Sequence, residues 1–294
     1  MRPYLAVDWG TSNVRAWRIN EAGAAEAACE MPLGVGRIAK GDAPAVFARI
    51  RAATHCDDLP ALLCGMIGST LGWREAPYVA CPASAADLIP ALVRPSAGVA
   101  IVPGLRAEGI TGAPDVMRGE ETQVFGWRAL YAEPAEAHLC LPGTHSKWVR
   151  LEGSRLTQFT TALTGELYDV LTKHSVLRAD TSVERADAFL LGVNAAGDGG
   201  ALSSRLFGAR ARVVTGSADA ASTASYLSGL LIGAEIAALA PSTGRVTLIG
   251  APALTTLYAR ALQHRGLSAR EEDGADAVIA GLNALVQKGA LDAA

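Results

Sequence analysis

Residues 8–13 (DWGTSN) combine side chains that could bind a polyphosphate. A carboxylate ends a short apolar run at Asp8, and small and hydroxylated residues follow it, namely Gly10, Thr11, Ser12 and Asn13. Such a turn leaves backbone N–H groups and hydroxyls open to an anion, and the carboxylate beside it suits a Mg²⁺ ion shared with the phosphates. The segment predicts a site for a Mg²⁺-bound polyphosphate, and the alternative is an ordinary glycine-containing hairpin turn.

A second cluster of the same kind follows the apolar stretch 138–141. It consists of Gly143, Thr144, His145, Ser146 and Lys147. Two such turns could hold one phosphate chain from both sides. Neither a G-x-x-x-x-G-K-[ST] loop nor a G-x-S-x-G elbow occurs in the sequence, which argues against P-loop kinases and common serine hydrolases.

The elements that must position these turns alternate between strands and helices. Two hairpins are predicted, at 4–8 with 14–19 and at 148–151 with 156–160. Further strands are expected at 61–64, 99–102, 212–215 and 246–249, and helices at 43–54, 117–131, 254–264 and 275–287. The pattern predicts an α/β chain of two related halves, because a hairpin with a polar turn occurs in each. We expect domains at 1–115 and 116–294, with the terminal helix able to return to the first.

Composition excludes several classes of protein. The chain has 294 residues, of which 50% are hydrophobic, and a net charge of −3, so it is globular without the basic excess that nucleic-acid binding needs. The longest uncharged runs fall short of the roughly 20 apolar residues that span a bilayer. Five scattered cysteines indicate neither a disulfide framework nor a zinc site. We expect a cytoplasmic protein without nucleic-acid or membrane partners.

Four motifs resemble one family. DWGTSNVRAW, GMIGSTLGWREAPYVACPA, PDVMRGEETQVFG and LPGTHSKWV, which span residues 8–149, are similar to the 2-dehydro-3-deoxygalactonokinase family of the actin-like sugar kinase and Hsp70 ATPase superfamily. Weaker similarity continues almost to the end of the chain. The resemblance implies two ribonuclease-H-like domains, ATP between them, and transfer of the γ-phosphate to the terminal hydroxyl of a sugar acid.

The resemblance also implies roles for particular residues. Asp8 would lie near Mg²⁺, with residues 10–13 as the first phosphate loop and 143–146 as the second. Lys147 would either add charge to the second loop or face solvent. Gly250, in the turn after the strand 246–249, would belong to the adenosine loop, where a missing side chain lets adenine lie on the backbone.

A catalytic base is implied at the start of the helix that precedes the second phosphate loop. Asp115 fits this position, because the predicted helix 117–131 follows it. A carboxylate that accepts the hydroxyl proton typically contributes ~10²–10⁴-fold to the rate. The alternative for Asp115 is a helix N-cap, and Glu120 and Glu121 are the other candidate bases.

The predicted loop 65–82 carries groups suited to a polyhydroxylated acid. An aromatic ring can cover the carbon chain, polar groups can bind hydroxyls, and a cation can bind the carboxylate. The candidate substrate residues are Ser69, Trp73, Glu75, Tyr78 and Arg118. Arg15 and Arg74 are alternative partners for the carboxylate, and packing into the domain core is the alternative role for the aromatic residues.

Together these observations predict an ATP- and Mg²⁺-dependent kinase of 2-dehydro-3-deoxy-D-galactonate in galactonate catabolism. Its partners would be the sugar acid and ATP, and a homodimer is compatible with the sequence. Two other hypotheses stay open: a kinase of another sugar or sugar acid on the same fold, and a non-catalytic module that senses sugar or nucleotide. The substrate rests on the resemblance and not on residue chemistry.

Overall fold

The computed structural model describes residues 1–110, 112–132, 134–182, 184–197 and 201–292. Within it the chain divides into two compact units. Unit 1 contains Met1–Glu136, Arg150–Phe159 and Gly274–Ala294, and unit 2 contains Ala137–Val149 and Thr160–Asp273. The chain therefore passes between the units more than once, and its C-terminal segment belongs to the unit in which it begins.

Unit 1 is built on a mixed sheet with the strand order β3-β2-β1-β4-β7-β6. The strands are β1 (Tyr4–Trp9), β2 (Val14–Ile19), β3 (Ala25–Met31), β4 (Ala61–Gly65), β6 (Val93–Ser96) and β7 (Val99–Ile101). The first three strands are antiparallel neighbours, whereas β4 runs parallel to β1 and β7 runs parallel to β4. Since β1 and β4 are parallel, both deliver the residues after their last positions to the same edge of the sheet.

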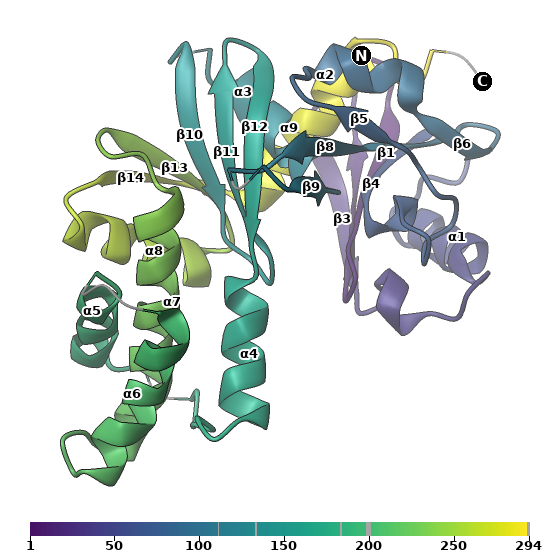
Figure 1. Ribbon diagram of the computed structural model, residues 1–294. Coiled ribbons are helices and arrows are strands. Elements are labelled where there is room, and N and C mark those ends of the chain that lie inside the picture. The colour runs from purple at the N-terminus through teal and green to yellow at the C-terminus, as the bar shows by residue number, and fades with distance from the viewer. Residues whose placement is uncertain (111, 133, 183, 198–200, 293–294) are drawn as a thin grey trace. The chain divides into compact units, whose positions relative to one another are not determined.

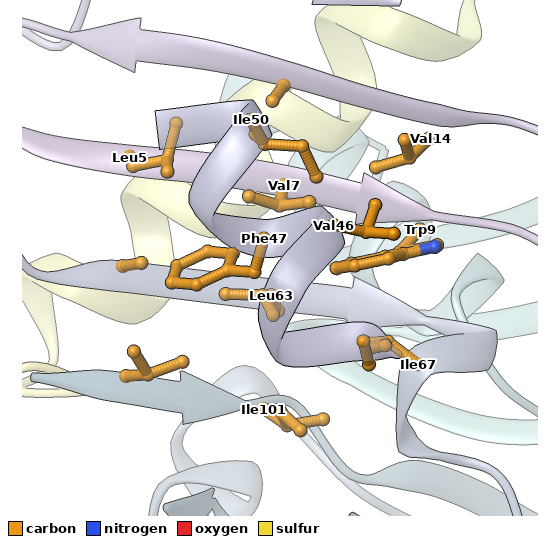
Figure 2. Close-up of a cluster of buried hydrophobic side chains, with 14 of the residues drawn as sticks. Leu5, Val7, Trp9, Val14, Val46, Phe47, Ile50, Leu63, Ile67 and Ile101 are labelled. Carbon is orange, nitrogen blue, oxygen red and sulfur yellow. The ribbon is translucent and has the colours of Figure 1, made fainter. Parts of the chain in front are cut away.

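The core of unit 1 lies between this sheet and helix α1 (Ala43–Ala53). Figure 2 shows Val46, Phe47 and Ile50 of α1 directed at Val7 and Leu63 of the two central strands. All five side chains are buried, and full burial of each one contributes on the order of 1.5–3 kcal/mol. This packing fixes the central strands, and with them the turns that follow.

The remaining elements of unit 1 lie around this core. A small sheet has the order β5-β8-β9, formed by β5 (Tyr78–Ala80), β8 (Gly104–Glu108) and β9 (Pro114–Met117). Three helices belong to this unit as well, α2 (Ala85–Leu88), α3 (Glu120–Leu130) and α9 (Gly274–Gln287). Helices α3 and α9 touch through their backbones, because a Cβ on Gly126 would lie 1.8 Å from the carbonyl oxygen of Ala277.

A second large sheet repeats the order of the neighbouring strands β3-β2-β1-β4-β7 of the first. The second large sheet has the order β12-β11-β10-β13-β14 (Figure 1), from β10 (Glu136–Leu141), β11 (Ser146–Glu152), β12 (Arg155–Ala162), β13 (Arg245–Gly250) and β14 (Ser268–Asp273). The end of β11 and the first five residues of β12 belong to unit 1. Strand β13 is parallel to β10, and β14 is parallel to β13. The two halves predicted from the recurring hairpin are thus visible as one strand order used twice, and the predicted α/β class is confirmed.

The helices of unit 2 pack on one another, and the last of them also packs on β13 and β14. They are α4 (Thr164–His174), α5 (Ala186–Ala195), α6 (Leu202–Val214), α7 (Thr223–Leu239) and α8 (Pro252–His264). One helical stretch, Ala220–Leu239, is long and apolar enough to cross a membrane by length and composition alone. In its most apolar window 67% is buried inside the protein, and it contacts α4, α5, α6 and α8, so packing explains its apolar character.

Some predicted elements are wrong. The expected strand 212–215 lies at the end of helix α6, and Asp115 lies in strand β9 instead of opening a helix. Helix α3 begins at Glu120, directly after Gly119, whose φ of +108° is left-handed and incompatible with a helix passing through it. Strands β3 and β14 were not predicted. The sequence of β14, SAREED, is polar because β14 is an edge strand, which pairs with β13.

Candidate active site

The first predicted phosphate loop is the turn between β1 and β2. Residues 11–13 of this turn are exposed. Among the described residues, no acceptor is found for the backbone N–H groups of Thr11 and Ser12, so these donors are available to an anion. The sequence pattern thus corresponds to a turn that presents donors at the end of a central strand.

The segment after β3, residues 34–36, holds this turn in place through backbone hydrogen bonds. The N–H groups of Gly34, Val35 and Gly36 donate to the carbonyl oxygens of Ser12, Gly10 and Thr11 at 2.9–3.0 Å. The approach is so close that a Cβ on Gly34 would lie 2.4 Å from Thr11. These bonds engage the carbonyls of the turn, and none of them uses the N–H donors of Thr11 and Ser12. Sequence reasoning missed this role of residues 34–36.

Asp8 lies opposite Arg15 in the β1–β2 ladder and pairs with it. The distance from Arg15 Nη2 to Asp8 Oδ2 is 2.6 Å, and the other oxygen, Oδ1, lies 4.0 Å from the Cys64 thiol of β4. Gly65 follows Cys64 with a φ of +89°, and a Cβ there would lie 3.3 Å from Asp8 Oδ1. A carboxylate is therefore held at the edge where β1 and β4 end, with its charge balanced by a guanidinium.

The start of helix α3 lies against the same edge of unit 1. A Cβ on Gly119 would be 3.1 Å from the Cα of Gly65. Glu121 is fully buried and accepts from the Gly119 N–H at 2.6 Å, whereas Glu120 is partly exposed and accepts from the Arg118 N–H at 3.1 Å. Burial, and then the charge of Glu120, raise the pKa of Glu121 to about 8. Glu121 is therefore mostly protonated at neutral pH.

Asp115 belongs to strand β9 of the small sheet. It pairs with Ala107 of β8, and its Oδ1 accepts from the N–H of Val116 at 2.7 Å. The prediction that Asp115 opens the helix before the second phosphate loop is wrong in its local structure. The two carboxylates at that helix start are Glu120 and Glu121, which were the alternative candidates.

The predicted substrate residues take different positions in unit 1. Arg118 is 8% exposed, lies over the ring of Tyr78 at 4.3 Å and donates from Nη2 to the carbonyl of Ala76. Its Nε and Nη1 are buried without a hydrogen-bond partner among the described residues. Trp73 packs on Phe47 with ring centroids 5.3 Å apart, which is the core role that the sequence left open.

The other two predicted substrate residues lie on the loop near Tyr78. Ser69 Oγ accepts from the N–H of Leu71, so this hydroxyl stabilises a local turn. Glu75 is exposed. Within the predicted substrate set, the structure brings Arg118 and Tyr78 together as a cation–ring pair, at 4.3 Å.

The second predicted phosphate loop is the turn between β10 and β11 in unit 2. Thr144 and His145 are exposed, while Ser146 and Lys147 are buried. Lys147 Nζ donates to Thr161 Oγ1 at 2.8 Å, so the open alternative in which this side chain faces solvent is excluded. The N-terminus of α4 packs on the turn, since Glu166 N–H donates to the Thr144 carbonyl at 3.0 Å.

A buried polar network lies beneath this second turn. Tyr258 OH donates to Glu235 Oε2 at 2.8 Å, and Trp148 Nε1 donates to Oε1 at 2.6 Å. Ser146 Oγ lies 2.8 Å from the Tyr258 oxygen and must be the donor, because the phenol has a single proton. The Ser146 hydroxyl is therefore engaged below the turn. Burial raises the pKa of Glu235, and these donors oppose the rise.

An apolar pocket of about 130 Å³ opens beside the same turn, within unit 2. It is lined by Gly143, Thr164, Gly165, Tyr168, Ser228, Leu231, Ile232, Leu254, Leu257 and Tyr258. The helices that line it, α4, α7 and α8, are visible together in Figure 1. Gly250 ends β13 just before α8 but does not line the pocket, whereas Leu254 and Leu257 of the following helix do.

Comparison with known proteins identifies the family of this chain. A family model described as 2-keto-3-deoxy-galactonokinase matches residues 8–285. The chain belongs to this family. A probable 2-dehydro-3-deoxygalactonokinase of Rhizobium meliloti (strain 1021) is 40% identical, over 96% of this chain and 95% of that protein. A 2-dehydro-3-deoxygalactonokinase of Escherichia coli (strain K12) is 34% identical, over 96% and 97%.

Solved structures support the family and the fold. A crystal structure of a Sinorhizobium meliloti protein assigned to the same kinase activity superposes with a TM-score of 0.89 at 38% identity, over 97% of this chain and 98% of that one. An activator of 2-hydroxyisocaproyl-CoA dehydratase from Clostridium difficile has a TM-score of 0.52 at 11% identity, over 98% and 96%, a likeness of fold alone. The galactonokinase family and the actin-like fold predicted from the motifs are confirmed.

The family match does not assign a metal site to particular residues. Among the described residues no group of three or more His, Cys, Asp or Glu side chains is arranged to hold a metal ion. Mg²⁺ commonly binds through one or two carboxylates, with water and substrate phosphates as the other ligands. Asp8, with an oxygen not used by Arg15, fits that mode of binding.

Proposed function

We propose that this chain is an ATP-dependent kinase that transfers the γ-phosphate of ATP to the terminal (6-) hydroxyl of 2-dehydro-3-deoxy-D-galactonate, in galactonate catabolism. One observation carries the proposal beyond the family. The same strand order occurs in both large sheets, and in each sheet the turn after its first strand in the chain, β1 or β10, is the Gly/Thr/Ser turn predicted to bind phosphate. We also propose that the enzyme acts in the cytoplasm, which agrees with its five free cysteines.

The nucleotide would bind through both turns and the pocket of unit 2. The apolar pocket beside Gly143 suits adenine, since leucine and tyrosine side chains line it. The phosphates would then reach the turn at residues 143–147 of the same unit. The donors of residues 10–13, in unit 1, are the other groups that we propose for phosphate binding. The activator with a similar fold was solved with bound ADPNP, which supports nucleotide binding by this architecture.

Asp8 is the residue that we propose for Mg²⁺, directly or through water. The ion would neutralise charge on the phosphates when bound. Arg15 holds the Asp8 carboxylate in place at 2.6 Å, and Gly65 keeps the space next to Oδ1 free of a side chain. A direct metal contact at Oδ1 would leave the Arg15 pair intact.

Glu120 is the base that the geometry favours. Its partly exposed carboxylate lies at the start of α3, where Gly119 approaches Gly65 and thus the edge that carries Asp8. Glu120 would accept the proton of the attacking hydroxyl as the oxygen bonds to the γ-phosphorus and ADP leaves. Glu121 is a poorer candidate, since its pKa of about 8 keeps it mostly protonated at neutral pH. Asp115 stays the alternative base.

Arg118 is the proposed partner of the sugar-acid carboxylate. Its Nε and Nη1 lack acceptors, and a buried donor without a partner costs about 1–3 kcal/mol, so an arriving carboxylate would remove that penalty. The ring of Tyr78 is 38% exposed and lies over the guanidinium, so it would have to move aside for the carboxylate to bind.

A coupled assay of ADP release tests the proposed function. The purified protein would be offered ATP with 2-dehydro-3-deoxy-D-galactonate, other keto-deoxy acids, aldonates and neutral sugars. The proposal requires the highest kcat/KM for 2-dehydro-3-deoxy-D-galactonate and a product phosphorylated at the 6-hydroxyl. A higher kcat/KM for a different acid would replace the substrate, and turnover of none would favour a sensing role.

A further inference from the structure

His145 and Glu166 form a pair on the second predicted phosphate loop. The imidazole Nε2 lies 2.5 Å from Glu166 Oε2, and the side chains are 46% and 51% exposed. His145 is in the turn after β10, and Glu166 is in the first turn of α4. The pair thus links the loop to the helix that packs on it.

Backbone contacts fix the distance between these two elements. The Glu166 N–H donates to the Thr144 carbonyl at 3.0 Å. Gly165 lies so close to the loop that a Cβ there would be 2.4 Å from the carbonyl oxygen of Gly143. The backbone of Glu166 is therefore fixed next to the loop that carries His145.

Stability does not explain the pair. Exposed ion pairs contribute only about 0–1 kcal/mol, because water screens the charges and the side chains lose freedom. What the contact does achieve is orientation of the ring. An ionised Glu166 can only accept a hydrogen bond, so the facing ring nitrogen, Nε2, must carry a proton. The other ring nitrogen, Nδ1, is then the one that can bind another group. Among the described residues, Nδ1 of His145 has no hydrogen-bond partner.

The charge of the loop points to an anion as the partner of Nδ1. Lys147 is the other basic residue of the loop, and its buried ammonium donates to Thr161 of β12. His145 is thus the basic side chain that the loop exposes. The charged groups around it are Glu166 of α4, which faces it, and Lys147, which follows it in β11. A polyphosphate next to the ring would favour the imidazolium, whose Nδ1–H is a charge-assisted donor.

We propose that Glu166 positions the His145 ring so that Nδ1–H donates to the β- or γ-phosphate of the nucleotide. This inference rests on the proposed function, because it assumes that the nucleotide phosphates lie at residues 143–147. In this arrangement His145 contacts the nucleotide and Glu166 acts through His145.

The test compares nucleotides that differ only in their phosphates. Binding of ATP, ADP and AMP to the full chain would be measured by calorimetry for wild type, His145→Ala, Glu166→Ala and the double variant. We expect His145→Ala to weaken ATP about 10-fold or more, as loss of a charge-assisted hydrogen bond predicts, and to change AMP less than twofold. ADP should weaken as much as ATP if the β-phosphate is the acceptor, and should behave like AMP if the γ-phosphate is. Glu166→Ala should show the same selectivity with a smaller loss.

The double variant separates positioning from a structural role. If Glu166 acts through His145, Glu166→Ala causes no further loss of ATP affinity in the His145→Ala background. Glu184→Gln is the matched control, because it breaks another exposed pair of unit 2, that with Arg260 at 2.6 Å, and should leave the affinities for all three nucleotides unchanged.

Three results would overturn the inference. One is an equal loss of AMP and ATP affinity in His145→Ala, and another is a full additional loss on Glu166→Ala in the double variant. The third is wild-type ATP affinity in His145→Ala while wild type phosphorylates the sugar acid, which leaves the proposed function standing. Failure of wild type to bind ATP at all would overturn both.

Discussion

The hydroxyl of Tyr258 joins the Ser146 hydroxyl to the buried carboxylate of Glu235, with 2.8 Å to each oxygen. Tyr258 also lines the apolar pocket of unit 2. A single side chain therefore connects the second predicted phosphate loop, the core helix α7 and the proposed adenine pocket. Its position explains why a polar network is retained inside an otherwise apolar part of the unit.

Tyr258→Phe should destabilise the protein without changing its packing. Removal of the hydroxyl leaves Ser146 and Glu235 each short of a buried partner, which costs about 1–3 kcal/mol. Urea unfolding would measure the loss. Tyr168→Phe is the control, since Tyr168 lines the same pocket and is outside the network, and its stability should stay within about 0.5 kcal/mol of wild type. Equal stability of both variants would contradict the assigned network.

Glu121→Gln should change how stability depends on pH. The folded chain holds the Glu121 proton up to a pH of about 8, against 4.5 for the ordinary group. The native state then binds more protons than the unfolded state in this window, so the free energy of unfolding falls as pH rises, by up to about 1.4 kcal/mol per pH unit. The glutamine variant lacks this contribution, and its stability relative to wild type should increase from pH 5 to pH 8.

Urea unfolding of both proteins at several pH values in this range would measure the difference. Glu184→Gln, at an exposed carboxylate in unit 2, should follow the wild-type slope. Parallel curves for Glu121→Gln and wild type would show that Glu121 is ionised in the folded protein, against the effect of its burial.

Gly34→Ala should damage the first predicted phosphate loop. The added Cβ would lie 2.4 Å from Thr11, so the turn or the segment below it must shift. We expect ATP affinity to fall at least 10-fold and stability to fall by about 1–3 kcal/mol, as for overpacking elsewhere. Gly208→Ala in helix α6 is the control, since its Cβ meets nothing within 4 Å; it should keep ATP affinity and be at least as stable as wild type, because alanine favours a helix interior over glycine. Unchanged ATP affinity in Gly34→Ala would separate this turn from the nucleotide.

The two predicted phosphate turns and the strands before them could be read from the sequence because the signal is local. A buried run followed by Gly, Thr and Ser has few other structures open to it. The start of α3 could not be read in this way. Met117 and Val116 continue an apolar pattern, but pairing with β8 makes them a strand, and the positive φ of Gly119 delays the helix to Glu120.

Contacts between segments that are distant in the chain also could not be predicted from the sequence. Gly34 bracing residues 10–12, Glu166 holding His145 and Tyr258 supporting Ser146 each join residues more than 20 positions apart. The bracing segment GVGRIA even matches a loose nucleotide fingerprint, yet it forms only a short 3-10 helix at Val35–Arg37, and α1 begins later, at Ala43, so the motif does not open a helix. For Arg118 the sequence suggested the role, but only the structure showed two buried donors without acceptors.

Arg118→Met should separate substrate binding from stability. Loss of the guanidinium should raise the KM for the sugar acid about 10- to 100-fold, as expected for a charged hydrogen bond, with the KM for ATP unchanged. The free energy of unfolding should change little, because the variant removes two buried donors without acceptors together with the Nη2 hydrogen bond to the Ala76 carbonyl. Steady-state kinetics and urea unfolding would test the two parts. An unchanged KM for the sugar acid would move the carboxylate to Arg15 or Arg74.

Glu120→Gln should remove most of the turnover while it preserves the fold. If Glu120 accepts the hydroxyl proton, kcat should fall ~10²–10⁴-fold. ATP affinity should stay within about threefold, because the proposed nucleotide residues are unchanged and the amide oxygen can still accept from the Arg118 N–H.

Asp115→Asn is the comparison that decides between the two carboxylates. Asp115 lies in strand β9, where its side chain accepts from the N–H of Val116, and an asparagine oxygen can keep that contact. We therefore expect turnover close to wild type in this variant. The reverse pattern, a large loss in Asp115→Asn with normal turnover in Glu120→Gln, would return the role of base to Asp115. It would also require β9 to lie beside the reacting hydroxyl when both substrates are bound.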